Sequence, residues 1–399
     1  MNYTFSDNFR NLAPSAIREI LKNASDPSII AFAAGNPNAL SFPLEDIRRL
    51  SSDILAKNGP AALQYGTTEG YAPLRAAVRE RQEKRFGIGR AFDDVLITSG
   101  GQQGLELACR VLCNPGDTVL AEDPSFIGAL NAFRGIGARV VGIPLESDGM
   151  SLDVLREKLE NEPSVRLLYI ISSFQNPSGI CTSLEKRREI YRLCRDRGVV
   201  ILEDNPYGEL RFSGKDIPTL KSMDEDGVVV YCSSFSKLLS SGMRIGFVVA
   251  PSELLSKMVV AKQTEDVHTN LLFQMLCHRF LTECDFDAHI ESIRALYRKK
   301  CKIMLDEMDA CFPEGASFTR PEGGLFVWCT LPSGIELMPF VREALSRGVA
   351  VVPGTAFKTD TEAYTAHSFR VTYATPTDEQ LVCGVRILAD VMRDMLKKQ

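Results

Sequence analysis

Several motifs that identify common protein classes are missing from this sequence of 399 residues. Neither GxGxxG nor GxxxxGK[ST] occurs, so the usual loops for dinucleotides and nucleoside triphosphates are absent. The four histidines form neither an HExxH motif nor a pattern with paired cysteines, which argues against a metal site. A basic excess is lacking too, because 46 lysines and arginines face 51 aspartates and glutamates. We therefore expect a small-molecule substrate, no metal and no nucleic-acid partner.

Long apolar runs are also absent from the chain. No stretch approaches the roughly 20 apolar residues of a membrane span, and the N-terminal segment lacks the basic start and apolar core of a secretory signal. The eleven cysteines are scattered without the spacing of a disulfide framework. We therefore expect a cytoplasmic protein with no membrane partner, whose cysteines are reduced and mostly buried.

The sequence is rich in short β-branched segments that alternate with amphipathic helical patterns such as Leu184–Arg197. Strands that are apolar at consecutive positions and separated by helices are typical of an α/β fold, with a mostly parallel sheet between two layers of helices. From about residue 287, longer helices and fewer strands predict a smaller α/β domain. We predict an N-terminal arm with a short helix near Ala16–Leu21 (1–45), a large domain (46–286) and a small C-terminal domain (287–399).

Polar loops follow the predicted strands of the large domain. They have the sequences TSGGQQG, EDPSF, SSFQNPSG, EDNPYG and CSSFSK. In open parallel sheets, ligands bind at the carboxyl ends of the strands, where loops lead into helices. These loops therefore predict one shared ligand site.

The segment SSFSKLLSSGMRIG places Lys237 in a small, hydroxyl-rich loop after a strand. A lysine can form a Schiff base when burial and nearby cations lower the pKa of its amine. Ser234, Ser236 and Arg244 can hold a phosphate through charge-assisted hydrogen bonds. Taken alone, such a lysine is more often a solvated loop residue, and it is the neighbouring motifs that favour the Schiff base.

These segments resemble, in the same order, the motifs of class I/II aminotransferases of fold type I, which depend on pyridoxal 5′-phosphate (PLP). The similarity also includes TRPEGGLFVW and SFRVTYA and extends over nearly the whole chain. LQYGTTEGYAPLR and the VHTN segment are similar to the subgroup of 2-aminoadipate, kynurenine and broad-specificity aminotransferases. The resemblance implies a PLP cofactor and transfer of an amino group from an L-amino acid to a 2-oxo acid such as 2-oxoglutarate. It also implies ping-pong kinetics through aldimine and ketimine intermediates.

The resemblance assigns roles to individual residues around the cofactor. Lys237 would form the Schiff base and move the proton, and Asp204 would pair with the pyridine nitrogen so that the ring can accept electrons. Tyr207 and Asn176 would hydrogen-bond the 3′ oxygen, and Phe126 would stack on the ring. The phosphate contacts would come from Gly101, Gln102, Ser234, Ser236 and Arg244.

At two of these positions the chain departs from the family pattern. Many relatives carry a serine at the position of Gly101, so here the backbone N–H has to replace a side-chain bond to the phosphate. The family often has a tyrosine at the position of Phe126, so stacking is retained without a hydroxyl.

The resemblance also implies substrate contacts. Arg370 resembles the arginine that binds the α-carboxylate in a bidentate fork, and Asn176 and Gly35 would lie beside the substrate. Arg18 matches an arginine that engages the distal carboxylate in 2-aminoadipate-type relatives, although an arginine on a short amphipathic helix is usually solvated. We therefore expect acidic substrates such as glutamate or 2-aminoadipate first. Aromatic or branched-chain substrates remain an alternative if the Arg18 side chain turns away from the substrate.

Tyr65 in LQYG resembles the tyrosine that reaches the phosphate of a neighbouring subunit, so we expect a homodimer with shared active sites. Two other functions stay open. One is another fold-type I PLP enzyme, such as a C–S lyase or a decarboxylase, although a bound α-carboxylate argues against decarboxylation. The other is a non-catalytic PLP-binding regulatory module, but the 45 residues before the large domain contain no basic recognition helix.

Overall fold

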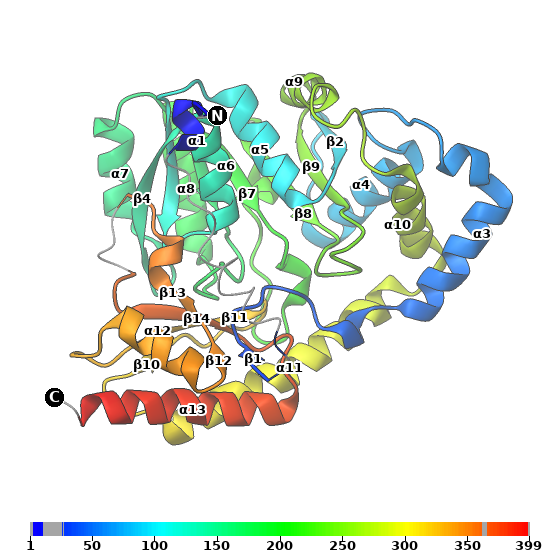
Figure 1. The fold of residues 1–399 in the computed structure, drawn as a ribbon. Helices are drawn as coiled ribbons and strands as arrows, with labels where there is room; N and C mark the ends of the chain where they lie inside the picture. The colour runs from blue at the N-terminus through cyan, green and yellow to red at the C-terminus, as the bar shows by residue number, and fades with distance from the viewer. Residues whose placement is uncertain (1–2, 11–25, 27, 361–364, 398–399) are drawn as a thin grey trace.

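A computed structural model describes residues 3–10, 26, 28–360 and 365–397 (Figure 1). An eight-stranded sheet has the strand order β2-β9-β8-β7-β6-β3-β4-β5. Its strands are β2 (Asp93–Thr98), β3 (Thr118–Asp123), β4 (Arg139–Glu146), β5 (Gly149–Met150), β6 (Val165–Ile170), β7 (Val200–Asp204), β8 (Val229–Ser234) and β9 (Gly246–Pro251). The five strands from β8 to β4 run parallel, whereas β9 is antiparallel to both of its neighbours and β5 to β4. The predicted mostly parallel sheet is confirmed.

Both faces of this sheet are covered by helices. Val119 and Ala121 of β3 pack in one hydrophobic cluster with Leu167, whereas Leu120 packs in a second cluster with Leu168. Alternate residues therefore enter two cores, as a sheet buried on both sides requires. The first core includes residues of α5, α6 and α9, and the second includes residues of α7 and α8. These helices are α5 (Gly101–Leu112), α6 (Ile127–Ile136), α7 (Leu152–Asn161), α8 (Leu184–Arg197) and α9 (Ser252–Gln263).

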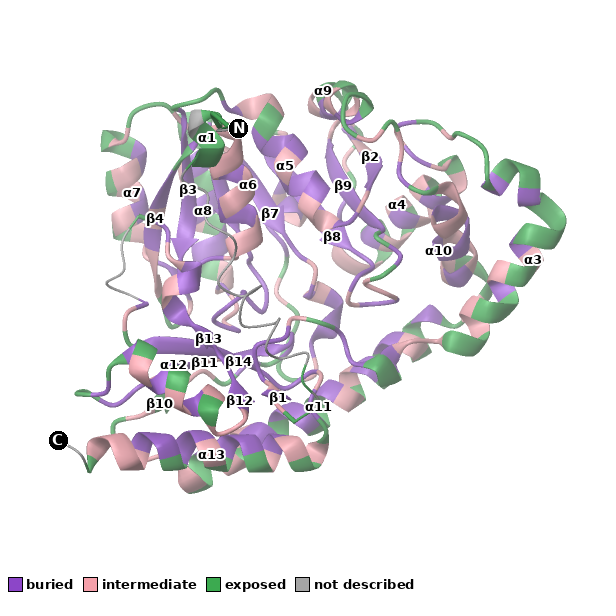
Figure 2. Cartoon of the chain, in the orientation of Figure 1, coloured by how far each residue is buried: buried purple, intermediate pink, exposed green. Residues whose placement is uncertain are grey.

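Helices α3, α4 and α10 extend the molecule beyond the β2 edge of the sheet (Figure 1). They span α3 (Leu44–Ala62), α4 (Ala72–Phe86) and α10 (Leu271–Glu283), and α10 packs against both of the others. In Figure 2 the strands of the large sheet are mostly buried, whereas α3 carries many exposed residues along its length. Leu44 and Leu55 of α3 are among its exposed apolar side chains.

The C-terminal part contains an antiparallel four-stranded sheet in the order β10-β11-β14-β13, with α11, α12 and α13 beside it (Figure 1). The elements are α11 (Phe286–Cys311), β10 (Ser317–Phe318), β11 (Phe326–Thr330), α12 (Leu337–Ser346), β13 (Val352–Pro353), β14 (Ser368–Thr372) and α13 (Asp378–Leu396). Helix α11 contacts α13 and also the short 3₁₀ helix Gly208–Leu210. The division into an arm (1–45), a large domain (46–286) and a small domain (287–399) stays a prediction.

The described part of the predicted arm lies against the C-terminal part. Strand β1 (Ile30–Ala31) pairs in parallel with β12 (Val349–Ala350), and a 3₁₀ helix at Ala39–Ser41 leads into α3. The short helix α1 (Asp7–Arg10) lies near α6. The helix predicted near Ala16–Leu21 lies outside the described residues.

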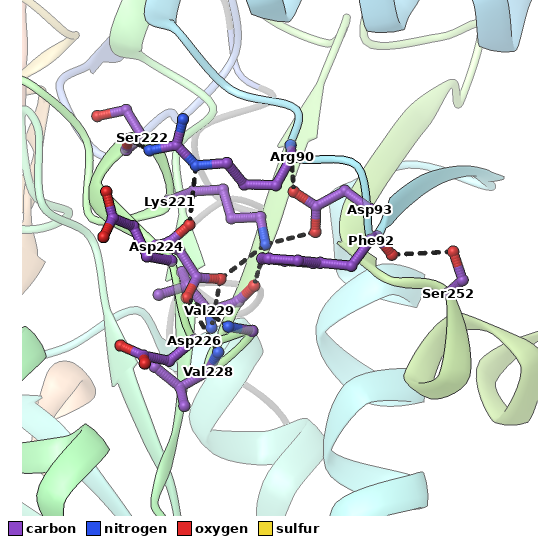
Figure 3. A network of polar contacts seen from close by, with 12 residues as sticks. Arg90, Phe92, Asp93, Lys221, Ser222, Asp224, Asp226, Val228, Val229 and Ser252 are labelled. Atoms are coloured by element: carbon purple, nitrogen blue, oxygen red, sulfur yellow. Dashed lines mark hydrogen bonds and ion pairs between the residues drawn. The ribbon is translucent and has the colours of Figure 1, made fainter.

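A buried ion cluster joins the amino-terminal ends of β2 and β8 (Figure 3). The Nζ atom of the fully buried Lys221 donates to Asp93 Oδ1 (2.7 Å), Asp224 Oδ2 (2.8 Å) and the Val229 carbonyl (2.9 Å). The Arg90 backbone N–H donates to the other Asp93 oxygen at 2.9 Å. A buried charge is tolerated when ion pairs and hydrogen bonds compensate it as completely as they do here.

Among the described residues, no helix has the length and apolar composition needed to cross a membrane. Nor does this part of the chain gather three or more histidine, cysteine or acidic side chains where they could hold a metal ion. The cytoplasmic location stays a prediction.

Candidate functional site

A cavity of about 390 Å³ lies where the carboxyl ends of the parallel strands face the arm and the C-terminal part. Loops after β2, β3, β6, β7 and β8 contribute to its wall, as the pattern of polar loops predicts. The predicted residues that line it are Gly35, Gly101, Gln102, Phe126, Asn176, Asp204, Tyr207, Ser234, Ser236, Lys237, Arg244 and Arg370. Of the predicted site residues that the structure describes, all except Tyr65 therefore line one cavity.

Lys237 follows β8 and points its amine toward the arm. Its Nζ donates a hydrogen bond to the Gly35 carbonyl at 2.6 Å. Burial, together with the positive charges of Arg370 and Arg244, lowers the pKa of the Lys237 amine to about 8. A substantial fraction of the amine is therefore neutral near neutral pH, which is the form that acts as a nucleophile or base.

Asp204 ends β7, and its carboxylate is held from β6. The Tyr169 hydroxyl donates to Asp204 Oδ2 at 2.8 Å, and both residues are buried. Burial raises the pKa of Asp204 to about 7, although the bond from Tyr169 opposes the shift. A cationic group in the cavity would stabilise the ionised carboxylate, so the position is suited to bind a positive charge. Burial also raises the pKa of the Tyr207 phenol, which stays protonated and can donate.

Arg370 lies on β14 and is fixed from three directions. Its Nη1 donates to Asn176 Oδ1 and its Nη2 to the Ala33 carbonyl, each at 2.9 Å. The guanidinium carbon lies 4.2 Å from the ring centroid of Phe326 and 5.0 Å from that of Phe357. Burial lowers the pKa of Arg370 to about 10, so the group stays charged at neutral pH. A rigid, buried and charged fork is suited to bind a carboxylate.

A second group of residues in the cavity wall can donate to an anion. The first turn of α5 has no side-chain cap, so its backbone N–H groups are available to an anion at the positive end of the helix. Arg244 Nη1 approaches Ser236 Oγ at 3.5 Å, and Ser234 Oγ donates to Ser236 Oγ at 2.7 Å. Gly100 precedes the helix with a φ of +84°, and a Cβ there would lie 2.2 Å from Arg244 Nη2. Only glycine fits this close approach, which brings the guanidinium to the helix start.

One predicted residue lies away from the cavity, and another is not among the described residues. Tyr65 is 80% exposed. Its ring packs edge-on against that of His268, with 5.7 Å between the two ring centroids. Leu63, two residues before it, is exposed as well, so this surface is partly apolar. Arg18 lies outside the described residues.

Sequence reasoning missed two aromatic residues that contact site residues, Tyr169 at Asp204 and Phe357 at Arg370. Tyr169 lies within the apolar strand LLYII, and Phe357 lies in a 3₁₀ helix beyond β13, so both have the composition of ordinary core. The one usable signal was the Tyr169 hydroxyl, because a buried tyrosine needs a hydrogen-bond partner. Nothing in the sequence marks Phe357.

Comparisons with known proteins agree on one family. Residues 27–388 match the family model of aminotransferase class I and II. The 2-aminoadipate transaminase of Thermus thermophilus is 42% identical, over 96% of this chain and 94% of that protein. Aromatic-amino-acid aminotransferase 1 of Thermococcus litoralis is 37% identical, over 99% of this chain and 95% of that protein. The crystal structure of α-aminoadipate aminotransferase from Thermus thermophilus, complexed with N-(5′-phosphopyridoxyl)-L-leucine, matches with a TM-score of 0.89 at 39% identity, over 99% and 98%.

Proposed function

This chain belongs to the class I and II aminotransferases, and from that premise we propose that Lys237 holds the cofactor of the enzyme. The protein is an aminotransferase that depends on PLP, so the predicted family, subgroup, fold type I and cofactor are confirmed. Its substrates are amino acids and oxo acids. The roles of single residues and the identity of the substrates are the proposal.

The donors around the cavity fit the cofactor. We assign its phosphate to Arg244, Ser234, Ser236 and the backbone N–H groups of Gly101 and Gln102, because they form a compact anion site. Among the other lining residues, Phe126 would stack on the ring, Asp204 would pair with its nitrogen, and Tyr207 and Asn176 would bind its 3′ oxygen. When bound, PLP accepts the electrons that the substrate releases as its Cα proton leaves.

The side chains then divide the chemistry among themselves. The Lys237 amine, with its lowered pKa, takes the proton from the substrate Cα and returns it as general base and general acid. Asp204, held by Tyr169, keeps the ring nitrogen protonated by pairing with it. Arg370 holds the α-carboxylate and so orients the Cα–H bond toward the amine. We propose ping-pong kinetics, in which the donor leaves as an oxo acid before the acceptor binds.

For the substrate we propose an L-amino acid with a distal carboxylate, such as 2-aminoadipate or glutamate, and 2-oxoglutarate as an acceptor. Among the described residues that line the cavity, the cations are Lys237, Arg244 and Arg370, and each already has a role. A distal carboxylate therefore needs a cation from elsewhere, which would be Arg18. Leu105, Ile171 and Phe326 line the cavity as well, so aromatic or branched side chains are compatible with its wall.

We also propose a homodimer in which Tyr65 reaches the phosphate site of the neighbouring subunit. The supporting observation is its position, because Tyr65 is exposed close to the exposed Leu63 and does not line the cavity of its own chain. The two sites of a dimer would then each be completed by the partner.

One observation carries the proposal: Lys237, Asp204, Arg244 and Arg370 converge on one cavity with charges that match the parts of PLP and an amino acid. The test is a single-turnover titration of the purified holoenzyme with a panel of amino acids, in which the absorbance of the bound cofactor is followed. We expect conversion to pyridoxamine phosphate that 2-oxoglutarate reverses, with acidic donors reacting first. Release of ammonia and pyruvate would show a lyase, and PLP binding without conversion would show a binding module.

A further inference from the structure

A second ion cluster, made of a buried lysine and a partly exposed aspartate, lies behind the turn that leads from β2 into α5. Lys262, in the last turn of α9, is fully buried, and its Nζ donates to Asp266 Oδ1 at 2.6 Å and to Gln103 Oε1 at 2.9 Å. Asp266 Oδ2 accepts from Gln103 Nε2 at 2.9 Å and from Ser99 Oγ at 2.7 Å. The cluster therefore connects α9, the segment after it, the first turn of α5 and Ser99.

Ser99 is the residue through which this cluster reaches the turn. Its backbone N–H donates to Gln103 Oε1 at 2.8 Å, and its hydroxyl also lies 3.1 Å from Thr269 Oγ1. Its carbonyl accepts from Arg244 Nη2 at 3.4 Å. The N–H, hydroxyl and carbonyl of Ser99 are thus all bonded, the first two to the ion cluster and the third to the arginine assigned to the phosphate.

The chain has little freedom between Ser99 and the start of α5. Gly100 adopts a φ of +84° and leaves no room for a side chain against Arg244. On the other side, a Cβ on Gly246 would lie 2.6 Å from the Gly100 carbonyl carbon. With Ser99 fixed and Gly100 enclosed, the direction of the following N–H groups is set by the cluster.

We propose that Lys262, Asp266, Gln103 and Ser99 are positioning residues, which hold the Ser99–Gln102 turn in the conformation that binds the cofactor phosphate. This proposal rests on the proposed function, which places the phosphate at the start of α5. None of the four lines the cavity, so they act through the backbone of the turn. Donors held in place before a ligand arrives bind it more tightly, because no ordering is needed on binding.

The proposal separates the phosphate from the rest of the cofactor, and this makes it testable. Apoenzyme is titrated with pyridoxamine 5′-phosphate and with pyridoxamine, which differ only in the phosphate and form no covalent bond with Lys237. In Asp266→Asn we expect the dissociation constant of pyridoxamine 5′-phosphate to rise about tenfold, since a hydrogen bond to a charged group is weakened. The constant for pyridoxamine should change by less than about twofold, because its ring contacts do not depend on the turn.

Two further variants make the result decisive. Ser99→Ala removes the hydroxyl contacts with Asp266 and Thr269 and keeps the backbone bond to Gln103, so it weakens the link to the turn without deleting a charge. We expect a rise of about threefold for the phosphorylated ligand alone. Ser99→Ala decides the question if Asp266→Asn does not fold. Asp224→Asn is the matched control, because it alters the carboxylate beside another fully buried lysine, Lys221, at the opposite end of the sheet. It should lower thermal stability and leave the ratio of the two constants unchanged.

Equal weakening of both ligands in Asp266→Asn and Ser99→Ala would overturn the proposal and reduce the cluster to a structural role. Unchanged affinity for the phosphorylated ligand in both variants would overturn it as well. A different result would instead refute the phosphate assignment in the proposed function: wild-type apoenzyme that binds the two ligands equally well. The two failures are therefore distinguishable.

Discussion

Buried ionisable residues surround this cavity, and the chain uses them in different ways. Lys237 and Asp204 face the cavity, and their shifted pKa values fit a base and a partner for a cation. Glu122, at the end of β3, is buried as well but does not line the cavity. Its Oε2 accepts from the Ile171 N–H at 2.9 Å, and its Oε1 has no hydrogen-bond partner among the described residues. Burial raises the pKa of Glu122 to about 8.

From the raised pKa of Glu122 we predict that this residue lowers the free energy of unfolding by an amount that depends on pH. Below its unfolded pKa, near 4.5, the carboxyl is protonated in both states and costs nothing. As the pH rises toward 8, only the unfolded chain ionises, so the folded state loses stability. Glu122→Gln should stabilise the protein by roughly 1–3 kcal/mol at pH 7.5 and by much less at pH 5. Thermal unfolding of both proteins at the two pH values measures this, and an equal difference at both would refute it.

Arg18 gives a prediction about specificity. If Arg18 binds the distal carboxylate, Arg18→Ala should lower kcat/KM for 2-aminoadipate and glutamate by about 10- to 100-fold, as expected for a lost charge-assisted pair. The value for leucine and phenylalanine should change by less than about threefold. Arg10, the other arginine of the first twenty residues, serves as the matched control in Arg10→Ala. Equal losses for all four amino acids would remove Arg18 from the substrate pocket.

Secondary-structure elements were predictable where local signals decide their ends. The helix predicted at Leu184–Arg197 is confirmed at both ends, because Ser183 caps its first turn and Gly198 ends it at a φ of +66°. The direction of β9 was not predictable, since an apolar run such as RIGFVVA reads the same in parallel and antiparallel pairing. The pairing of β1 with β12 joins segments more than 300 residues apart, and no local pattern announces it.

The residues of the candidate site also fall into two groups, those with a local sequence signal and those placed by tertiary packing. Its cavity-facing residues lie in polar loops at strand ends, where glycine, serine and charge stand out from the apolar strands. Its supports, Tyr169 and Phe357, lie among apolar residues of the core. The Lys262 cluster brings together side chains from two segments more than 150 residues apart, 99–103 and 262–266. Such contacts depend on tertiary packing, which composition does not encode.

The Lys221 cluster joins β2 and β8, and we predict that it contributes strongly to the stability of the fold. Lys221→Met leaves Asp93 and Asp224 buried without their cation, so we expect a loss of about 3–5 kcal/mol in the free energy of unfolding. Lys302→Met removes an exposed pair with Asp306 at 2.6 Å on α11 and should cost less than about 1 kcal/mol. Denaturant unfolding of the two variants gives the comparison, and a Lys221 loss as small as that of Lys302 would contradict it.

The proposed dimer gives a prediction for the whole molecule. If Tyr65 serves the partner's site, then Tyr65→Ala and Lys237→Ala each inactivate a homodimer for a different reason. In a mixed dimer, one site combines Lys237 of the first chain with Tyr65 of the second, so it should regain activity. Co-refolding the two variants in equal amounts should restore up to about one quarter of the wild-type rate, since half the dimers are mixed and each carries one intact site. No recovery in dimers shown to be mixed would place Tyr65 outside the partner's site.

Arg370 belongs to β14, but its hydrogen bonds run to Asn176 after β6 and to Ala33 in the arm. Each Nη carries two N–H groups, so a carboxylate can accept from both while Asn176 and Ala33 keep their own bonds. If Arg370 binds the substrate carboxylate, as proposed, the docked arm holds the guanidinium ready for it. Docking of the arm and binding of the carboxylate are then linked equilibria, and such linkage is reciprocal. The arm would thus act as a shared support, used once by the donor and once by the acceptor in each catalytic cycle.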